Sequence, residues 1–175
     1  MGTLIKNRNV VSDRWLRLEK DAGAAGAPLP AGDLIVPLAL WQARREELLA
    51  REGRLGLWLD SADDPAAIAG DLAHFEVIAV NFPNFGDGRG FSTASLLRER
   101  YGWTGELRAV GDVFRDQLFF MAGVGFDAFE LRASENAAEA LTAFDTFSEA
   151  YQRSATRPVP LFRRRPSDAS DARKA

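Results

Sequence analysis

Two apolar runs, Leu55-Gly56-Leu57-Trp58-Leu59 and Val77-Ile78-Ala79-Val80, decide the fold of this chain. Neither run contains a polar side chain. A strand with one wet face alternates apolar and polar residues, whereas a strand that is apolar throughout is buried on both faces. Strands of the second kind occur in parallel sheets that helices cover. We therefore expect both runs to be central strands of an α/β fold.

Weaker strand signals flank these runs at Leu34–Val36, Glu106–Val110 and Ala128–Leu131. Segments with helical periodicity separate the strands, and they cover residues 41–51, 65–73, 92–100, 113–122 and 135–151. This alternation predicts one α/β domain of about five parallel strands alternating with helices. We expect an open, doubly wound sheet, with a partial barrel of the TIM type as the alternative.

The strands at Glu106–Val110 and Phe129–Arg132 alternate apolar and polar residues, unlike the two central runs. Each of them therefore has one wetter face. That face lies either at an edge of the sheet or toward the inside of a partial barrel, and the sequence leaves both interpretations open.

Composition divides the rest of the chain. Residues 1–20 carry loosely alternating apolar positions, which predict an N-terminal hairpin or an edge extension. Residues 21–32 are rich in Ala, Gly and Pro, which is typical of a linker. The α/β domain then covers residues 33–151, and residues 152–175, rich in Pro, Arg and Ser, are expected to form a flexible, disordered tail.

Charge and residue usage exclude several classes of function. The 175 residues carry a net charge of −3, which gives no overall attraction to nucleic acid or to an anionic membrane. No apolar run is long enough to span a bilayer, so we expect a cytoplasmic protein whose partners include neither nucleic acid nor a membrane. The chain has no cysteine and a single histidine, His74. We therefore expect no metal site, because thiolates and histidine clusters are both missing.

A glycine-rich loop, residues 81–92, follows the second central run. Its sequence is Asn81-Phe82-Pro83-Asn84-Phe85-Gly86-Asp87-Gly88-Arg89-Gly90-Phe91-Ser92. Glycines let the backbone approach a ligand closely, and the N-terminus of the following helix favours an anion. The glycine spacing fits neither the dinucleotide fingerprint nor the P-loop. We expect an anionic small molecule here, and the candidate ligand-binding residues are Asn81, Asp87, Gly88, Arg89, Gly90 and Ser92.

Two of these residues have a structural alternative of similar weight. Arg89 can offer a planar fork to an anion, or it can form an ion pair with Asp87 inside a tight turn. Ser92 is expected to cap the helix that follows, while its hydroxyl can still reach a ligand.

More polar residues follow the fourth strand, and parallel α/β proteins bind ligands beyond the carboxyl ends of their strands. Arg115 and Gln117 join the candidate ligand-binding residues at this rim. Asp112 and Asp116 are the candidate catalytic carboxylates. Asp112 also has the commoner interpretation of a helix N-cap.

Several stretches together resemble a bacterial family of unknown function. They are Asp87–Ser92, Leu97–Gly102, Gly105–Val113, Asp116-Gln117 and Gly125–Phe129. Members of that family are commonly labelled as oxidoreductases of sulfite reduction, because their genes lie beside those of sulfite or nitrite reductase. The resemblance covers about residues 33–151 and implies a role in sulfur assimilation. The reductase itself needs sirohaem and an iron–sulfur cluster, and this chain lacks the thiolates that hold a cluster.

Three functions follow from the residues and the resemblance. The first is an accessory protein of assimilatory sulfite reduction that binds an anionic ligand or cofactor at the glycine-rich loop. The second is a small enzyme with Asp112 or Asp116 as general base. The third is a non-catalytic subunit or assembly factor that docks sulfite or nitrite reductase. Because no redox-cofactor motif is present, the sequence names neither a cofactor nor a reaction.

Overall fold

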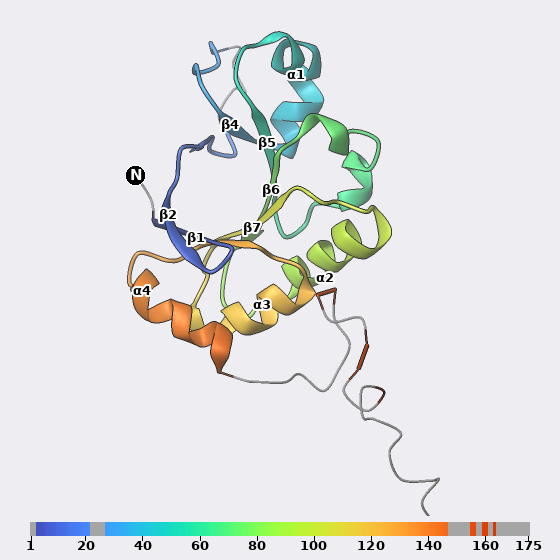
Figure 1. Ribbon diagram of the computed structural model, residues 1–175. Helices are drawn as coiled ribbons and strands as arrows, with labels where there is room; N and C mark the ends of the chain where they lie inside the picture. Colours follow the sequence, from blue (N-terminus) through green and yellow to red (C-terminus); the bar gives the residue numbers. More distant parts are fainter. Residues whose placement is uncertain (1–2, 22–26, 147–154, 157–158, 161–162, 164–175) are drawn as a thin grey trace, which may run out of the picture.

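The computed structural model describes residues 3–21, 27–146, 155–156, 159–160 and 163. They form a mixed α/β fold whose eight-stranded sheet curls into a half-barrel (Figure 1). The strands are β1 (Thr3–Lys6), β2 (Asn9–Ser12), β3 (Leu16–Arg17), β4 (Leu34–Pro37), β5 (Leu55–Leu59), β6 (Val77–Phe82), β7 (Glu106–Gly111) and β8 (Ala128–Glu130). The helices are α1 (Leu38–Ala50), α2 (Arg89–Ser95), α3 (Leu118–Val124) and α4 (Ala137–Ala140), accompanied by short 3₁₀ turns and one π turn.

The strand order β2-β1-β8-β7-β6-β5-β4-β3 decides between the two expected architectures. All neighbours from β3 to β8 are parallel and follow one another in chain order. In a doubly wound sheet the order reverses once, so that helices cover both faces. Here it never reverses, and right-handed crossovers keep the helices on one side. The doubly wound expectation is therefore wrong, and the partial-barrel alternative describes the sheet.

The sheet also has more strands than the sequence predicted. The expected strands are present as β4 to β8, and three further strands come from the N-terminal segment. β1 and β2 form an antiparallel hairpin around Asn7 and Arg8, which both have positive φ. A two-residue turn of this kind matches the twist of the strands it joins. β1 then pairs antiparallel with β8, so the hairpin extends one edge of the half-barrel.

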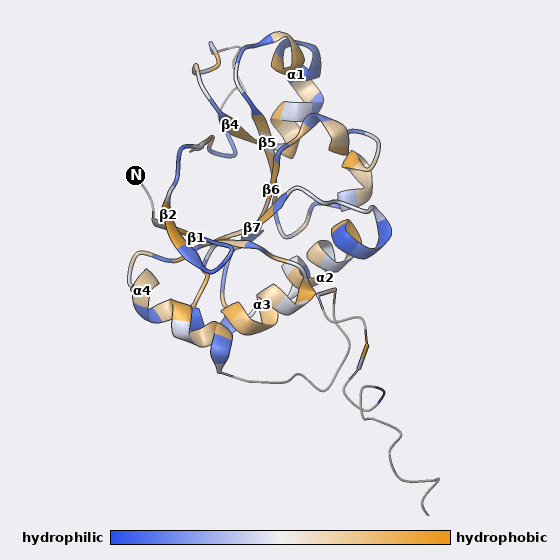
Figure 2. Ribbon diagram, viewed as in Figure 1, coloured by the Kyte–Doolittle hydropathy of each residue, from blue (hydrophilic) through white to orange (hydrophobic). Residues whose placement is uncertain are grey.

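Most of the core lies on the convex face, between the sheet and the helices (Figure 1). Ile78, Val80 and Phe82 of β6 are buried there. α2 packs closely because Gly90 has no side chain: a Cβ at this position would lie 2.6 Å from the Phe82 ring. Figure 2 shows the same division, with hydrophobic strands inside and hydrophilic segments of helix turned outward.

The concave face is covered by the segment that follows β2 and includes β3. We call residues 13–20 the strap, because they cross from one edge of the half-barrel to the other. Trp15 of the strap packs against an apolar cluster of Ile35, Trp58, Val77, Ala79 and Val110 on the inner side of the strands. The indole N–H of Trp58 donates to the Leu18 oxygen at 3.0 Å. The half-barrel is therefore filled with side chains and is not a pore.

A charged network lies beside this inner cluster. Arg108 is 1% exposed, and its guanidinium contacts Glu106 at 2.7 Å and Asp13 of the strap at 2.7 Å. Lys6 contacts the other oxygen of Glu106 at 2.6 Å. The alternating pattern of β7 thus comes from polar side chains that face the inside of the half-barrel, because β7 pairs on both sides and is not an edge strand.

Part of the sequence prediction falls outside the described residues. The middle of the predicted linker, residues 22–26, lies outside the described part of the chain. Of the predicted tail, residues 152–175, the structure describes residues 155–156, 159–160 and 163. Within the described part, the last predicted helix is present as α4 and a 3₁₀ turn at Leu141–Asp145. No helix of the described residues has the length and apolar character needed to cross a membrane.

Candidate small-molecule groove at the carboxyl ends of the strands

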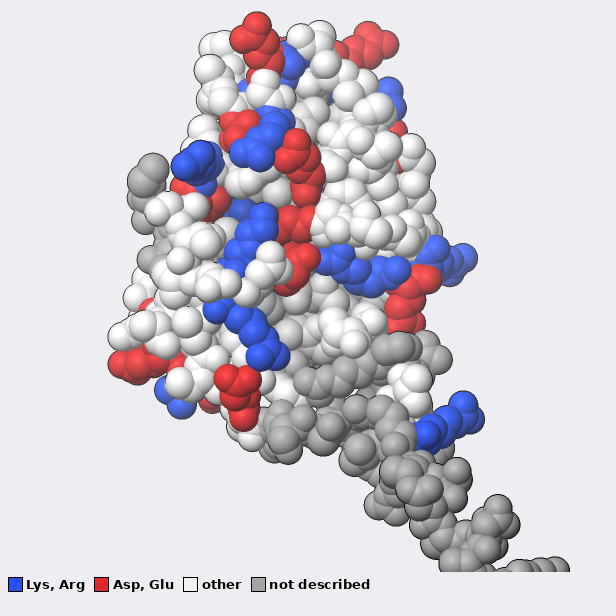
Figure 3. All heavy atoms as spheres, viewed as in Figure 1, with Lys and Arg blue, Asp and Glu red and all other residues white. Residues whose placement is uncertain are grey.

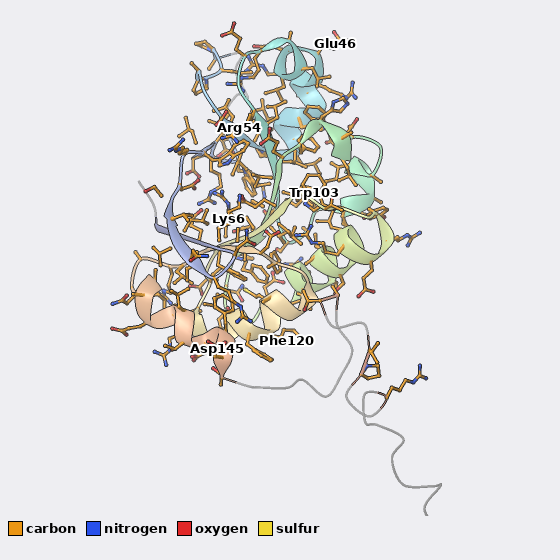
Figure 4. The ribbon with its side chains drawn as sticks, in the orientation of Figure 1. Lys6, Glu46, Arg54, Trp103, Phe120 and Asp145 are labelled. Carbon is orange, nitrogen blue, oxygen red and sulfur yellow. The ribbon has the colours of Figure 1, made fainter. Side chains whose placement is uncertain are left out.

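Charged side chains at the amino end of the half-barrel are paired with one another. In Figure 3, positive and negative side chains form a mixed band across this end. Figure 4, in the same orientation, labels two of the amino-end residues, Arg54 and Lys6. Arg54 contacts Asp33 at 2.5 Å and Glu76 at 3.2 Å, and it lies 4.9 Å from the Trp15 ring. In barrels of this type, residues at the amino end serve stability.

Arg98 is the most heavily bonded side chain at the amino end. It donates to the backbone oxygens of Gly125, Trp103 and Gly105, and to the carboxylate of Asp127, at 2.7–2.9 Å. Its side chain is 15% exposed. Burial lowers the pKa of Arg98 and raises the pKa of Asp127. These contacts tie the end of α3 to the loop before β7, so we assign Arg98 a structural role.

A groove opens at the opposite end, beyond the carboxyl ends of β6, β7 and β8. The part around Asp112 has a volume of about 710 Å³, which is within the range of small-ligand sites. The groove continues along β8, where Arg17, Glu130 and Arg132 are among the residues that line it. The lining residues that matter below are Asn81, Gly111, Asp112, Glu130, Arg132 and Ser134.

Asn81 has a fixed orientation in this groove. Its amide Nδ2 donates to the Asp60 carboxylate at 3.0 Å. Lys20 of the strap also contacts Asp60, and the two donors hold the pKa of Asp60 below its ordinary value. Asn81 Oδ1 lies against Gly111, where a Cβ would be 2.5 Å from this oxygen. Gly111 also has φ +95°, so both the space and the backbone require glycine.

Asp112 lies at the centre of the groove and does not cap a helix. Its Oδ2 accepts from the Phe85 N–H at 3.1 Å, and its Oδ1 lies 3.3 Å from Arg132 Nη1. The next 3₁₀ turn begins after Phe114, whose N–H donates to Gln117 Oε1 at 3.3 Å. The N-cap expectation for Asp112 is therefore wrong: its carboxylate holds the glycine-rich loop against β7.

Arg132 is a groove residue that sequence reasoning did not select. Its guanidinium lies 4.6 Å from the Phe114 ring, and its side chain is 42% exposed. Among the described residues, its charged partner is Asp112, at an ion-pair distance with no hydrogen bond. Arg17, which lines the same groove, donates to Glu130 at 2.9 Å. Of the two groove arginines, Arg17 is therefore hydrogen-bonded to a carboxylate, whereas Arg132 has an ion pair without a hydrogen bond.

The glycine-rich loop forms an internal ion pair. Arg89 donates to both oxygens of Asp87, at 2.9 and 2.6 Å, and also to Ser61 Oγ at 2.9 Å. The Asp87 side chain is 7% exposed, and Arg89 holds the pKa of Asp87 far below its ordinary value. Of the two interpretations left open by the sequence, the structure has the ion pair inside a turn, and the planar fork of Arg89 is occupied by a carboxylate.

The other predicted rim residues lie in or near short helices. Ser92 is an exposed residue inside α2, which begins at Arg89, so it does not cap that helix. Arg115 and Asp116 are exposed and lie 3.5 Å from each other. Gln117 Nε2 donates to the Phe85 oxygen at 3.4 Å and so supports the loop.

Two of the ten predicted site residues, Asn81 and Asp112, line the groove, and the remaining eight are not among its described lining residues. The sequence contained a signal for the residues that were missed. Arg132 and Ser134 lie two and four residues beyond the end of β8, at the same end of the sheet as Asp112, which directly follows β7. In the described part of the chain, no group of three or more His, Asp or Glu residues is arranged to hold a metal ion.

The structure is thus an α/β half-barrel with a polar groove beyond the carboxyl ends of its parallel strands. The chain belongs to the family described as "Bacterial protein of unknown function (DUF934)", whose model matches residues 56–162, more than half of the chain. The matched range runs from β5 past β8 and so includes Asn81, Asp112 and Arg132. Comparison with curated proteins and with solved structures gave no match.

Proposed function

We propose that this protein binds a small anionic ligand in the groove, with Arg132 as the residue that holds the anion, and that it acts as an accessory protein of assimilatory sulfite reduction. One observation carries the binding part of the proposal. Arg132 lies in the groove with its guanidinium over the Phe114 ring, and among the described residues its charged partner is Asp112, with which it forms no hydrogen bond, so its N–H donors can be offered to a ligand.

The energetic cost of recruiting an anion differs among the nearby arginines. An exposed ion pair contributes about 0–1 kcal/mol, so a ligand can displace the Arg132–Asp112 contact cheaply. Drawing Arg89 away would break two charge-assisted hydrogen bonds and leave the nearly buried Asp87 carboxylate without its partner. An incoming anion can therefore be held by a planar, bidentate guanidinium most easily at Arg132.

The pathway part of the proposal rests on the family resemblance described above. The motifs Asp87–Ser92 and Gly105–Val113 are contained in the matched range. Because the chain has no cysteine, the proposed role is accessory and does not include holding an iron–sulfur cluster.

A second candidate function, a small enzyme, is favoured by the position of one carboxylate. Asp112 lines the groove beside Arg132, so it could take a proton from a ligand whose anionic group Arg132 holds. Asp116 is exposed and does not line the groove. The enzyme hypothesis therefore narrows to Asp112.

A ligand screen with matched variants tests the binding proposal. Thermal-shift and calorimetric titrations would use sulfite, sulfate, phosphate, nucleotides, flavins and sirohaem precursors on the wild type and on Arg132→Gln. A ligand at about 100 times its dissociation constant adds roughly 2.7 kcal/mol of stability. Arg115→Gln is the control, because Arg115 is equally solvent-facing but lies outside the groove lining.

We expect at least one ligand to stabilise the wild type and the Arg115→Gln variant, and to lose its effect with Arg132→Gln. Binding that survives Arg132→Gln and disappears with Arg89→Ala would return the site to the glycine-rich loop. The absence of any stabilising ligand would count against the proposal and would favour the docking role.

A further inference from the structure

The orientation of the Asn81 amide restricts what the groove can bind. An amide side chain can present either its N–H₂ group or its oxygen, and the hydrogen-bond network decides which. Asp60 is a carboxylate whose pKa is lowered by Lys20 and Asn81, so it acts as an acceptor. Nδ2 must therefore face Asp60, and Oδ1 faces Gly111 and the groove.

Asn81 Oδ1 is available as a hydrogen-bond acceptor. Among the described residues, no donor is bonded to this oxygen. It is also not among the atoms that are both unpartnered and shielded from solvent, so a ligand can reach it. Asp60 acts on the groove through Asn81 and is thus a positioning residue. Lys20 on the strap fixes Asp60 from its other side.

The groove then combines one strong donor with several acceptors. Arg132 donates, Ser134 can donate or accept, and Asn81 Oδ1 and the Asp112 carboxylate accept. A bare oxyanion such as sulfate has acceptors alone. It would satisfy Arg132 but would leave Asn81 Oδ1 facing another acceptor, which costs binding free energy.

We infer that the ligand of this groove carries an anionic group and, a few bonds away, a hydrogen-bond donor such as an ammonium or hydroxyl group. This inference rests on the proposed function, because it takes Arg132 as the anion-holding residue. The anionic group binds at Arg132, and the donor binds at Asn81 Oδ1. The preferred class is therefore a small zwitterion or hydroxylated anion, and not a bare oxyanion such as sulfate.

Matched pairs of probes test this inference. Each pair shares an anionic group and differs by an ammonium replaced with a methyl group: taurine with propane-1-sulfonate, O-phosphoethanolamine with propyl phosphate, and β-alanine with butyrate. Calorimetry would measure each probe on the wild type, on Arg132→Gln and on Asn81→Leu. Asn81→Leu removes the acceptor while keeping the branching and number of side-chain heavy atoms, and far-UV circular dichroism with a melting curve would confirm that it folds.

For at least one pair, we expect the ammonium-bearing probe to bind the wild type about tenfold more tightly, the effect of one hydrogen bond. That preference should fall to about one in Asn81→Leu, while both probes should lose affinity in Arg132→Gln. A variant with serine, Asn81→Ser, keeps an acceptor and should keep part of the preference.

Two results would overturn the inference, and they are distinguishable from failure of the proposed function. Equal binding of both members of every pair, with dependence on Arg132, would show an anion site without a donor requirement. Sulfate that binds through Arg132 while every ammonium-bearing probe fails would show the same. If no anion of either kind binds through Arg132, both the inference and the proposed function are wrong.

Discussion

Replacing Arg98 with methionine tests the structural role assigned to the amino end of the half-barrel. Methionine keeps the length and apolar stem of the side chain but removes four hydrogen bonds, to the oxygens of Gly125, Trp103 and Gly105 and to Asp127. A hydrogen bond from a charged group contributes about 1.5–3 kcal/mol, although bonds from one guanidinium do not add independently. Losing one partner of a buried ion pair costs about 3–5 kcal/mol. Because the side chain is 15% exposed and so reaches some water, we expect a loss near the lower end, about 3–4 kcal/mol.

Urea unfolding followed by tryptophan fluorescence is the direct assay, since Trp103 lies in the loop that Arg98 holds. For a domain of this size the expected loss lowers the melting temperature by about 6–16 °C. Arg100→Met is the matched control, because Arg100 is exposed on the same π turn and contacts the Tyr101 ring at 5.8 Å. It should change the free energy of unfolding by less than about 0.5 kcal/mol. A loss below about 1 kcal/mol for Arg98→Met, or equal losses for both variants, would refute the structural role.

Three further predictions concern other parts of the half-barrel. Gly111→Ala should lower the free energy of unfolding by more than about 2 kcal/mol, from its positive φ and a close backbone oxygen, whereas Gly70→Ala, which meets open space, should be nearly neutral in the same urea titration. Arg108→Leu should cost about 3–5 kcal/mol, and adding Glu106→Leu should recover part of that loss; a larger loss in the double variant would contradict this. The pKa of Asp87 is lowered in the folded state, so its contribution to stability is present above its unfolded pKa of 3.8 and is lost as the pH falls below that value. The difference in unfolding free energy between the wild type and Asp87→Asn should therefore shrink from about pH 6 to about pH 3. A constant difference would count against the pairing of Asp87 with Arg89.

The sequence predicted the strands well because their signal is local. β5 and β6 are apolar throughout, and that pattern alone indicates burial on both faces. The N-terminal strands could not be placed in the same way. β3 has two residues, which are too few to show a period, and β1 pairs with β8, more than a hundred residues later in the chain. Pairing over such a distance leaves no periodicity for a sequence pattern to show.

The site predictions failed where a side chain is used by a distant backbone group or where a helix is irregular. Asp112 was expected to cap a nearby helix, but it accepts from Phe85, which lies 27 residues earlier. The helical spacing of residues 92–100 does not indicate the largely buried position of Arg98. The π turn Leu96–Arg100, with the Tyr101 N–H bonded to the Leu96 oxygen, adds a residue to that turn and rotates Arg98 toward the end of α3. Neither arrangement follows from helical spacing.

We propose that stability and ligand binding depend on different residues, which lie at opposite ends of the half-barrel. At the amino end, Arg54 and Arg98 are bonded to carboxylates or backbone oxygens, so their replacement should cost stability. At the carboxyl end, Arg132 has one exposed ion pair with Asp112 and a contact with the Phe114 ring, so Arg132→Gln should change the free energy of unfolding by about 1 kcal/mol. A charged residue that contributes little to the fold, yet lies in a groove beside a carboxylate and an oriented amide, is what a ligand site requires. Measuring both quantities on Arg98→Met and Arg132→Gln would separate the two roles: unfolding free energy should fall mainly in the first variant, and ligand affinity mainly in the second. If Arg132→Gln destabilised the fold as much as Arg98→Met, the arginine in the groove would be a structural residue and the ligand would have to be sought elsewhere.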